Sequence, residues 1–348
     1  MMIEKKMAEP VLVTGATGFI GKRVVKKLLE KDIAVRALVL PGEDPPSEWG
    51  ARVDIFRGSI SDPKAIEAAV SGGAASSISP SVERRVAGTI IHLAAVVSDW
   101  GDENKYWEYT VEGSRLIFEQ AIKNGSKVVL ISSIVVYGDN IYTRVCHEEV
   151  GYGKTFGPYS RTKQAQEKLA WEYHRQRGMA LTVIRPANVY GPGSGPWLHD
   201  VVDILKSGSP GLISGGEMNA GLAYVDNVAD LILLAGASDI ANGRAYNASD
   251  ALDITWRRYF SDIARFIGAR KPGSVPRPVA AFGAYVCEIL WTLFRIQKRP
   301  PITREALNLV GSENRIPNDR ARNELSFRPE ISYEEGLSQI NKCCFLKQ

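Results

Sequence analysis

The chain has 348 residues, of which 45% are hydrophobic and 24% are charged, so its composition is that of a globular protein and excludes disordered and fibrous classes. Its formal charge of +4 is small for this length. No Lys/Arg run interleaved with aromatic residues indicates a nucleic-acid site, and we expect no nucleic-acid partner.

Short apolar strands alternate with helical patterns in the first half of the chain. The apolar runs predict strands at 11–14, 35–40, 53–56, 89–95, 127–133 and 181–186. The intervening patterns predict helices at about 19–31, 62–71, 104–124 and 159–177. This alternation is typical of an α/β doubly wound parallel sheet covered on both faces. The Gly/Ser/Pro-rich segment 71–85 interrupts it, and we interpret that segment as a flexible surface insertion without a function.

The first strand leads into TGATGFIG (14–21), which places Gly15, Gly18 and Gly21 at a turn from strand to helix. Glycine lets the backbone approach a pyrophosphate closely, and the helix N-terminus then stabilises the negative charge. The spacing is GxxGxxG rather than GxGxxG. After an apolar strand and before an amphipathic helix, this turn predicts a nucleotide site.

Cysteine usage and the N-terminus indicate the cytoplasm. The four cysteines show no CxxC spacing, and the first ten residues are too polar for a secretion signal. The string CHEE at 146–149 offers metal-type ligands, but adjacent residues rarely converge on one ion, so we predict a polar loop and no metal site. The apolar segment 279–296 contains Glu288 near its middle, which favours a buried or interfacial helix, with peripheral membrane contact as an alternative.

Four motifs in order carry a resemblance to a known family: the glycine turn, HLAA (92–95), ISSIVVYG (131–138) and PYSRTK (158–163). Together they resemble the extended short-chain dehydrogenase/reductase family over about residues 10–340. The resemblance implies a Rossmann-type NAD(P)-binding domain at 10–191 and a smaller, mostly helical substrate lobe at 192–342. Segments at about 222–248 are expected to return to the core.

The resemblance also implies roles for single residues. Tyr159 and Lys163 match the catalytic YxxxK pair, and Ser133 matches the catalytic hydroxyl, with Ser132 as the alternative. The residues that match the family's cofactor contacts are Gly15, Thr17, Gly18, Phe19, Ile20, Gly21, Ser59, Ile60, Leu93, Ala94, Ala95, Tyr159, Lys163, Pro186, Asn188 and Val189. An ammonium beside a phenol favours the phenolate, so Lys163 is expected to lower the pKa of Tyr159.

Departures from the family pattern affect the cofactor. Ser59 stands where many members have an aspartate, and Thr110 stands where many have an asparagine. The second strand ends at Val39 and Leu40, with neither the acid typical of NAD binding nor the arginine typical of NADP binding. We expect NAD or NADP, and favour NAD.

Finer similarity in 98–114, 254–268 and 300–337 resembles the branch that contains 3β-hydroxysteroid dehydrogenases and 3-oxoalkanoate reductases. The sequence therefore predicts an NAD(P)-dependent oxidoreductase that interconverts a secondary alcohol and a ketone on a steroid-like or long-chain substrate. One alternative is a nucleotide-sugar epimerase or dehydratase that holds a diphosphate with basic residues of the C-terminal lobe. The basic candidates are Arg257, Arg258, Arg315, Arg320 and Arg322.

A second alternative is a regulatory NAD(P)-binding protein without turnover. A homodimer is also predicted, because the helix at 104–124 is apolar beyond one narrow stripe, and in the family this helix and the one with Tyr159 build a dimer bundle. The apolar residues concerned are Tyr106, Trp107, Val111, Leu116 and Ile117.

Overall fold

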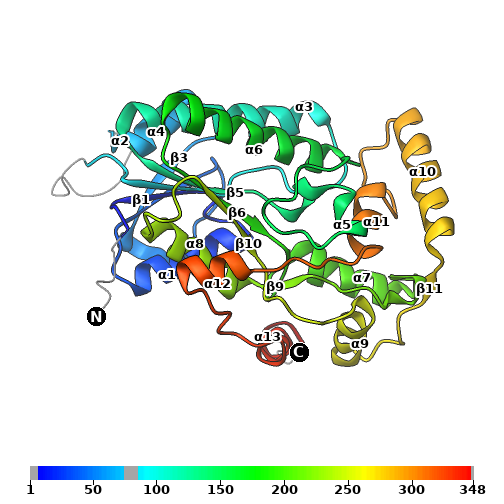
Figure 1. The fold of residues 1–348 in the computed structure, drawn as a ribbon. Helices are drawn as coiled ribbons and strands as arrows, with labels where there is room; N and C mark the ends of the chain where they lie inside the picture. Colours follow the sequence, from blue (N-terminus) through cyan, green and yellow to red (C-terminus); the bar gives the residue numbers. More distant parts are fainter. Residues whose placement is uncertain (1–6, 74–84, 346–348) are drawn as a thin grey trace.

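A seven-stranded parallel sheet forms the centre of the protein, whose computed structural model describes residues 7–73 and 85–345 (Figure 1). The strand order is β10-β6-β5-β4-β1-β2-β3, so the order reverses between β1 and β4. The strands are β1 (Val11–Thr14), β2 (Val35–Val39), β3 (Val53–Arg57), β4 (Thr89–His92), β5 (Lys127–Ile131), β6 (Leu181–Pro186) and β10 (Arg244–Ala248). The predicted Rossmann-type doubly wound sheet is confirmed.

Helices cover both faces of the sheet, as Figure 1 shows. On one face lie α1 (Phe19–Glu30) and α8 (Val225–Ala237), which pack against each other. On the other face lie α2 (Pro63–Ser71), α4 (Gly113–Asn124) and α6 (Pro158–Arg177). The strands are almost wholly buried because their side chains fill two apolar cores, one under each helical layer.

Some observed boundaries differ from the sequence-based ones. The strand expected at 89–95 ends at His92, since the chain leaves the sheet there to pass the glycine turn. The helix expected at 104–124 consists of α3 (Glu103–Tyr106), a π-helical turn (Trp107–Glu112) and α4, joined without a break in helical backbone angles. Residues 74–84 of the expected insertion at 71–85 lie outside the described residues.

The C-terminal part of the chain supplies small elements beside the carboxyl ends of the strands. Two short pairs of parallel strands are β7 (Asn188–Tyr190) with β9 (Leu222–Tyr224), and β8 (Leu212–Ile213) with β11 (Ser274–Val275). Residues 225–248 supply α8 and the edge strand β10 to the core. The remaining helices are α5 (Asn140–Thr143), α7 (Asp200–Ser207), α9 (Trp256–Phe266), α10 (Arg277–Leu293), α11 (Arg304–Val310), α12 (Asp319–Leu325) and α13 (Tyr333–Ile340).

Candidate active site

The glycine turn lies at the carboxyl end of β1, beside the point where the strand order reverses. Gly15 has φ of +65°, and a Cβ there would lie 2.9 Å from the backbone nitrogen of Ala94. A Cβ on Gly21 would lie 2.1 Å from the Gly15 carbonyl oxygen. Only glycine fits this cradle, and Gly18 leads into α1 at Phe19. The turn and the exposed amides of the helix end therefore fit the pyrophosphate of a dinucleotide.

Other predicted cofactor residues surround this turn. Ala94, which follows Leu93 and precedes Ala95, donates its backbone N–H to the Thr14 hydroxyl over 3.2 Å. The Thr17 hydroxyl donates to the Glu43 carboxylate over 2.6 Å. That carboxylate lies four residues beyond the end of the acid-free strand, in the loop after β2.

The remaining predicted contacts have structural partners within the chain. The Ser59 hydroxyl lies 2.9 Å from that of Ser61, and Ile60 is buried. Pro186 is the last residue of β6, and Val189 is buried in β7. The side-chain amide of Asn188 donates to the Ala220 carbonyl over 2.7 Å, so it joins the loop after β6 to the segment before β9.

Ser133 and Tyr159 are brought together by two neighbouring elements. Ser133 follows β5 and caps a short 3₁₀ turn by accepting the Val135 N–H over 3.3 Å. Tyr159 is the second residue of α6, and its hydroxyl is hydrogen-bonded to Ser133. The alternative hydroxyl, Ser132, instead donates to Glu167 over 2.6 Å. The structure thus pairs the predicted serine with the predicted tyrosine.

Lys163 lies one helical turn beyond Tyr159 and is 2% exposed. Its ammonium donates to the Ile131 carbonyl over 2.8 Å and to the Gln166 side-chain oxygen over 2.9 Å. Burial lowers the pKa of Lys163 to about 7, even though Glu167 opposes this shift. The charge of Lys163 therefore changes near neutral pH.

The pKa of Tyr159 shifts in the direction opposite to the one expected from the sequence. Burial raises the pKa of Tyr159 to about 12, and the hydrogen bond from Ser133 offsets only part of this effect. Glu305 and Tyr106 raise it further. The physical reason is that the Lys163 ammonium is hydrogen-bonded to Ile131 and Gln166 rather than to the phenol.

A buried chain of hydrogen bonds connects Lys163 with the glycine turn. Gln166 accepts from Lys163 and donates to the Ser114 hydroxyl over 2.7 Å. Ser114 donates to the Thr110 carbonyl, so the 2.8 Å contact with His92 assigns the donor to the imidazole Nε2. The other nitrogen of His92 then accepts from Thr14 over 2.7 Å.

His92 stays neutral in this chain. Burial, followed by the charge of Lys163, lowers the pKa of His92 to about 3. The neutral imidazole can both donate and accept a hydrogen bond, which the chain from Gln166 to Thr14 requires. The position of Lys163 is thereby coupled to the strand that ends at the glycine turn.

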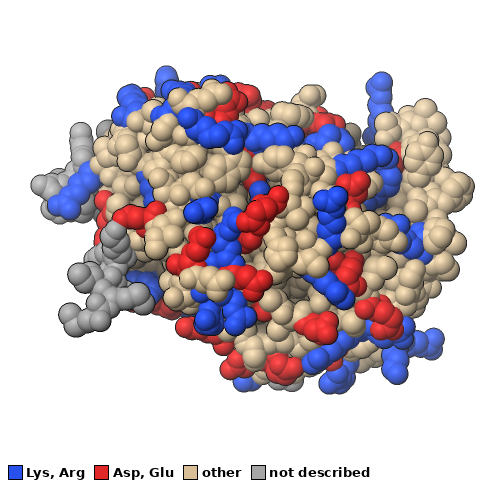
Figure 2. Space-filling view, in the orientation of Figure 1, with Lys and Arg blue, Asp and Glu red and all other residues tan. Residues whose placement is uncertain are grey.

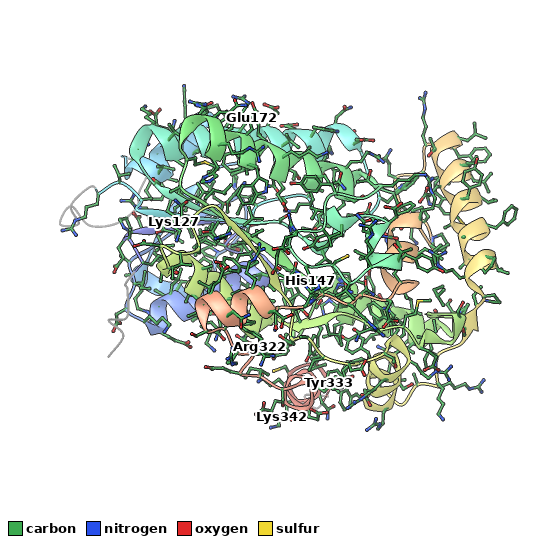
Figure 3. The ribbon with its side chains drawn as sticks, viewed as in Figure 1. Lys127, His147, Glu172, Arg322, Tyr333 and Lys342 are labelled. Atoms are coloured by element: carbon green, nitrogen blue, oxygen red, sulfur yellow. The ribbon has the colours of Figure 1, made fainter. Side chains whose placement is uncertain are left out.

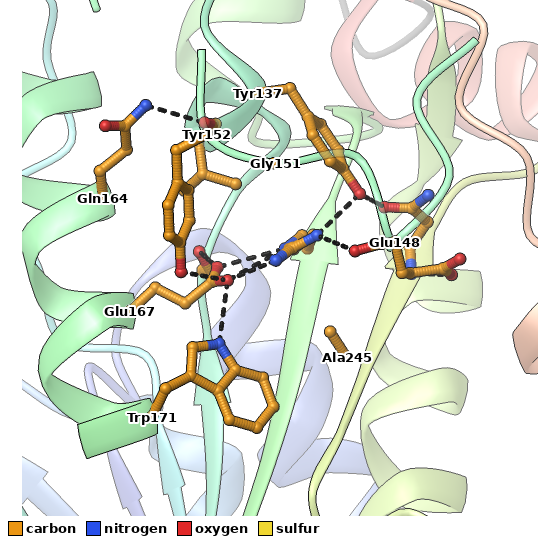
Figure 4. Close-up of polar contacts among 12 residues, drawn as sticks. Tyr137, Glu148, Gly151, Tyr152, Gln164, Glu167, Trp171 and Ala245 are labelled. Carbon is orange, nitrogen blue, oxygen red and sulfur yellow. Dashed lines mark hydrogen bonds and ion pairs between the residues drawn. The ribbon is translucent and has the colours of Figure 1, made fainter. Parts of the chain in front are cut away.

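Glu167 anchors α6 to the sheet (Figure 4). Its carboxylate forms an ion pair with Arg185 of β6 at 2.5 Å, with both side chains buried. Tyr152 and Trp171 donate to it over 3.1 and 3.3 Å, and both point at the carboxylate in Figure 4. Burial alone would raise the pKa of Glu167, but Arg185 brings it below its ordinary value. The pair fixes the helix that carries Tyr159 and Lys163.

A second carboxyl group, Glu305, reaches the start of α6 from the C-terminal part of the chain. Glu305 is 4% exposed and accepts the Ser160 backbone N–H over 3.0 Å and its hydroxyl over 3.2 Å. Burial and then the charge of Asp99 raise the pKa of Glu305 to about 8. This residue therefore caps α6 one position after Tyr159.

A cavity of about 790 Å³ lies beside the start of α6, between that helix and α10. Its lining includes Gly157 and Pro158, which immediately precede Tyr159 in the chain, but neither Tyr159 nor Ser133. Much of the lining is apolar. The apolar and aromatic members include Trp100, Phe156, Pro158, Tyr285, Ile289 and Trp291.

Comparison with known proteins decides the family. The sequence profile of the NAD dependent epimerase/dehydratase family matches residues 11–249, which is more than half of the chain. The chain belongs to this family. The prediction of an enzyme of the extended short-chain dehydrogenase/reductase type is thereby confirmed.

Relatives of this family member include reductases and dehydrogenases. The chain is 25% identical over 348 residues to a 2-alkyl-3-oxoalkanoate reductase of Stenotrophomonas maltophilia (strain K279a), covering 95% of this chain and 98% of the relative. It is 23% identical over 344 residues to a sterol-4-alpha-carboxylate 3-dehydrogenase, decarboxylating, of Mus musculus, covering 95% and 90%. The predicted branch of the family is thus confirmed.

The fold is shared with an epimerase of the same family. A crystal structure of the UDP-glucose 4-epimerase of Thermotoga maritima with UDP-glucose matches with a TM-score of 0.73 and 23% identity, covering 96% of this chain and 97% of that one. At this identity the likeness supports the Rossmann-type fold alone. The substrate must be inferred from the residues of this chain.

Sequence reasoning missed three residues at this site. Gln166 lies three positions after Lys163 on the same helix, and the i, i+3 rule could have identified it as a partner. Glu43 stands in the string PGED, three residues after the position at which an acid was sought. Glu305 is 145 residues from Ser160, and no local pattern indicates that contact.

Proposed function

We propose that this protein is an NAD-dependent oxidoreductase that interconverts a ketone and a secondary alcohol on a mainly apolar substrate. The observation that carries the reaction type is the hydrogen-bonded pair Ser133 and Tyr159, with Lys163 one helical turn further on and the glycine cradle beside it. A hydroxyl, a phenol and an ammonium in this order can polarise a carbonyl oxygen and supply its proton.

Each member of the trio has one task in the reduction. Bound NADH supplies the hydride to the carbonyl carbon. Ser133 donates a hydrogen bond to the carbonyl oxygen, and Tyr159 gives that oxygen its proton. A proton from water then restores Tyr159, while Lys163 would hold the ribose hydroxyls of the bound cofactor. The oxidation of the alcohol follows the same steps in reverse.

An apolar substrate is supported by the cavity and by the ion pairs that occupy most of the candidate C-terminal arginines. The cavity beside the start of α6 presents a cluster of aromatic and aliphatic side chains from α10 and from the segment before α6, alongside charged residues of both signs. Four of the five cations considered for a diphosphate pair with carboxylates: Arg257, Arg258, Arg315 and Arg320 with Glu217, Glu334, Glu313 and Glu149, respectively. Two named relatives act on a 3-oxoalkanoate and on a sterol carboxylate, which are also mainly apolar.

The test of the reaction is the removal of the Tyr159 hydroxyl. Tyr159→Phe should lower kcat by about 10²- to 10⁴-fold and leave the affinity for NADH unchanged, because only the proton donor is lost. Tyr142→Phe, which removes a phenol from an exposed surface position, is the matched control and should leave kcat unchanged. Turnover of the Tyr159 variant near that of the wild type would refute the assignment.

The test of the substrate class is a paired panel with cofactor present. Steroid ketones and long-chain 3-oxo compounds should be reduced, as measured by the loss of NADH absorbance. UDP-sugars should neither bind tightly nor be converted. Tight binding of a UDP-sugar with no reaction on the apolar panel would support the epimerase alternative. Binding of NADH with no turnover on either panel would support a regulatory protein.

We further propose NAD rather than NADP, on the basis of Glu43. Its carboxylate, held by Thr17 of the glycine turn, would repel the 2′-phosphate of NADP. The ratio of kcat/KM for NADH to that for NADPH should be well above one and should fall about tenfold or more in Glu43→Gln. The exposed Glu30→Gln is the control. An unchanged ratio in the Glu43 variant would refute this role.

A further inference from the structure

Helix α10 (Arg277–Leu293) exposes large apolar side chains to solvent, whereas an ordinary surface helix turns such side chains toward the core. Its buried residues are two alanines, Ala280 and Ala284, and Ala280 packs in a small apolar cluster with Ile213 and Leu307. Its large side chains face solvent, with Phe282 71% exposed. Figure 3 shows many side chains of this helix, at the right edge of the molecule, pointing away from the rest of the protein.

The exposed side chains form one continuous stripe rather than isolated positions. Residues 289, 290 and 293 lie 7, 8 and 11 positions after residue 282. All four therefore share one face of the helix. The next residue, Phe294, is 67% exposed. The stripe consists of Val279, Phe282, Ile289, Leu290, Leu293 and Phe294, each at least 40% exposed, and Ile289 and Leu293 also border the cavity beside α6. Single exposed apolar residues are normal, but a contiguous set of this size marks a binding surface.

Positive charge surrounds this apolar stripe. Residues 270–299 contain six Lys and Arg and one acidic residue, a net charge of +5 against +4 for the whole chain. Exposed cations stand at both ends, with Arg270 and Lys271 before the helix and Arg295 and Lys298 after it. The acid, Glu288, is turned inward and paired with Arg304. In Figure 2 the corresponding right edge is largely tan, with blue at its upper and lower ends.

We propose that the exposed face of α10 and its flanking cations dock this protein onto an anionic lipid surface. Aromatic and aliphatic side chains enter the boundary between headgroups and acyl chains, and the cations contact lipid phosphates. Among the described residues, no helix is both long and apolar enough to cross a membrane. The helix therefore lies along the surface.

The charge favours a lipid surface over a second copy of this chain as the occupant. In a two-fold symmetric dimer through this face, each basic border would face a basic border of the other copy, and like charges would repel. An anionic bilayer instead neutralises both ends of the helix at once. The proposal concerns the surface alone and does not depend on the substrate or on turnover.

The experiment is sedimentation of the full-length protein with vesicles. The wild type should bind vesicles of phosphatidylcholine with phosphatidylglycerol, and bind pure phosphatidylcholine or high-salt samples much less. Phe282→Asp combined with Leu293→Asp should weaken binding about tenfold or more. Ile240→Asp is the matched control, because Ile240 is 63% exposed but precedes β10 at the opposite, amino end of the strands. It should bind as the wild type does.

The flanking charges are tested separately. Arg295→Glu combined with Lys298→Glu should weaken binding to anionic vesicles by at least about fivefold per changed residue. Retained NADH binding shows that each variant is folded. Absence of wild-type binding to anionic vesicles, or equal loss in the Ile240 control, would overturn the proposal. Sedimentation velocity that shows a dimer dissociated by the α10 variants, without vesicle binding, would identify a second copy as the occupant.

Discussion

Replacement of Glu167 by glutamine should destabilise the protein by about 3 to 5 kcal/mol, because it breaks a buried ion pair from one side only. Glu167 is fully buried, and the Arg185 side chain is 6% exposed. The new amide side chain would be neutral and could accept some of the hydrogen bonds from Ser132, Tyr152 and Trp171, so the lower end of this range is expected. The main cost is the guanidinium of Arg185, left charged and buried without its counter-ion.

Urea unfolding of Glu167→Gln measures this effect directly, and a cycle of four proteins, the wild type, two single variants and their double variant, isolates the contribution of the pair. The single variants Glu167→Leu and Arg185→Met should each lower the free energy of unfolding by several kcal/mol. The double variant should cost much less than the sum, because no charge stays buried without a partner. Glu67→Gln removes an ion pair with Lys123 in which both side chains are exposed, and should have little effect.

The result that would refute this reasoning is additivity. If the two single variants each cost about 1 kcal/mol or less, or if the double variant costs their full sum, the pair does not hold α6 to the sheet. A change in the dependence of the unfolding free energy on urea would also show that two-state unfolding fails, and thermal inactivation rates of the same four proteins would then decide.

Three further predictions concern the buried carboxyl group of Glu305, the glycine turn and the oligomeric state. The pKa of Glu305 is about 8 in the folded protein and near 4.5 in the unfolded chain. Its protonated carboxyl group therefore contributes stability that is lost as pH rises from about 4.5 to 8. Urea unfolding should therefore show Glu305→Gln gaining stability relative to the wild type between pH 5 and 8.5, and a constant difference would contradict this. Gly21→Ala should weaken NADH binding about tenfold or more by fluorescence titration, since its Cβ would collide with the Gly15 carbonyl; unchanged affinity would refute the cradle. Sedimentation velocity at micromolar concentration should show a homodimer that Trp107→Glu dissociates, because Trp107 is 41% exposed on the predicted bundle, and a wild-type monomer would reject it.

Local sequence patterns were enough to predict the scaffold and the order of the chemical groups. The glycine turn is readable because three positions without a Cβ after an apolar strand impose one backbone path. The four-residue spacing of Tyr159 and Lys163 places them on one helix face, and the resemblance to the family implied their roles. The alternation of apolar strands and amphipathic helices likewise predicted the doubly wound sheet.

The outward face of α10 could be decided only by the tertiary structure. The same apolar segment suits a buried helix or an exposed one, since periodicity does not reveal which face meets the core. In the fold, Tyr285, Ile289 and Trp291 line the cavity beside α6, whereas Phe282 and Phe294 face solvent. Similarly, Tyr106, Val111 and Ile117 of the predicted dimer helix are buried within the single chain.

The electrostatic state of the site also depends on contacts between distant segments. Glu305 reaches Ser160 across 145 residues, and Arg185 reaches Glu167 from a neighbouring strand. The pKa of Tyr159 rises because burial outweighs its local partners, although the sequence suggested a fall. Spacing along a chain determines which groups share a helix face or a turn. Burial and long-range charge depend on the packing of whole elements, and only the folded chain specifies that packing.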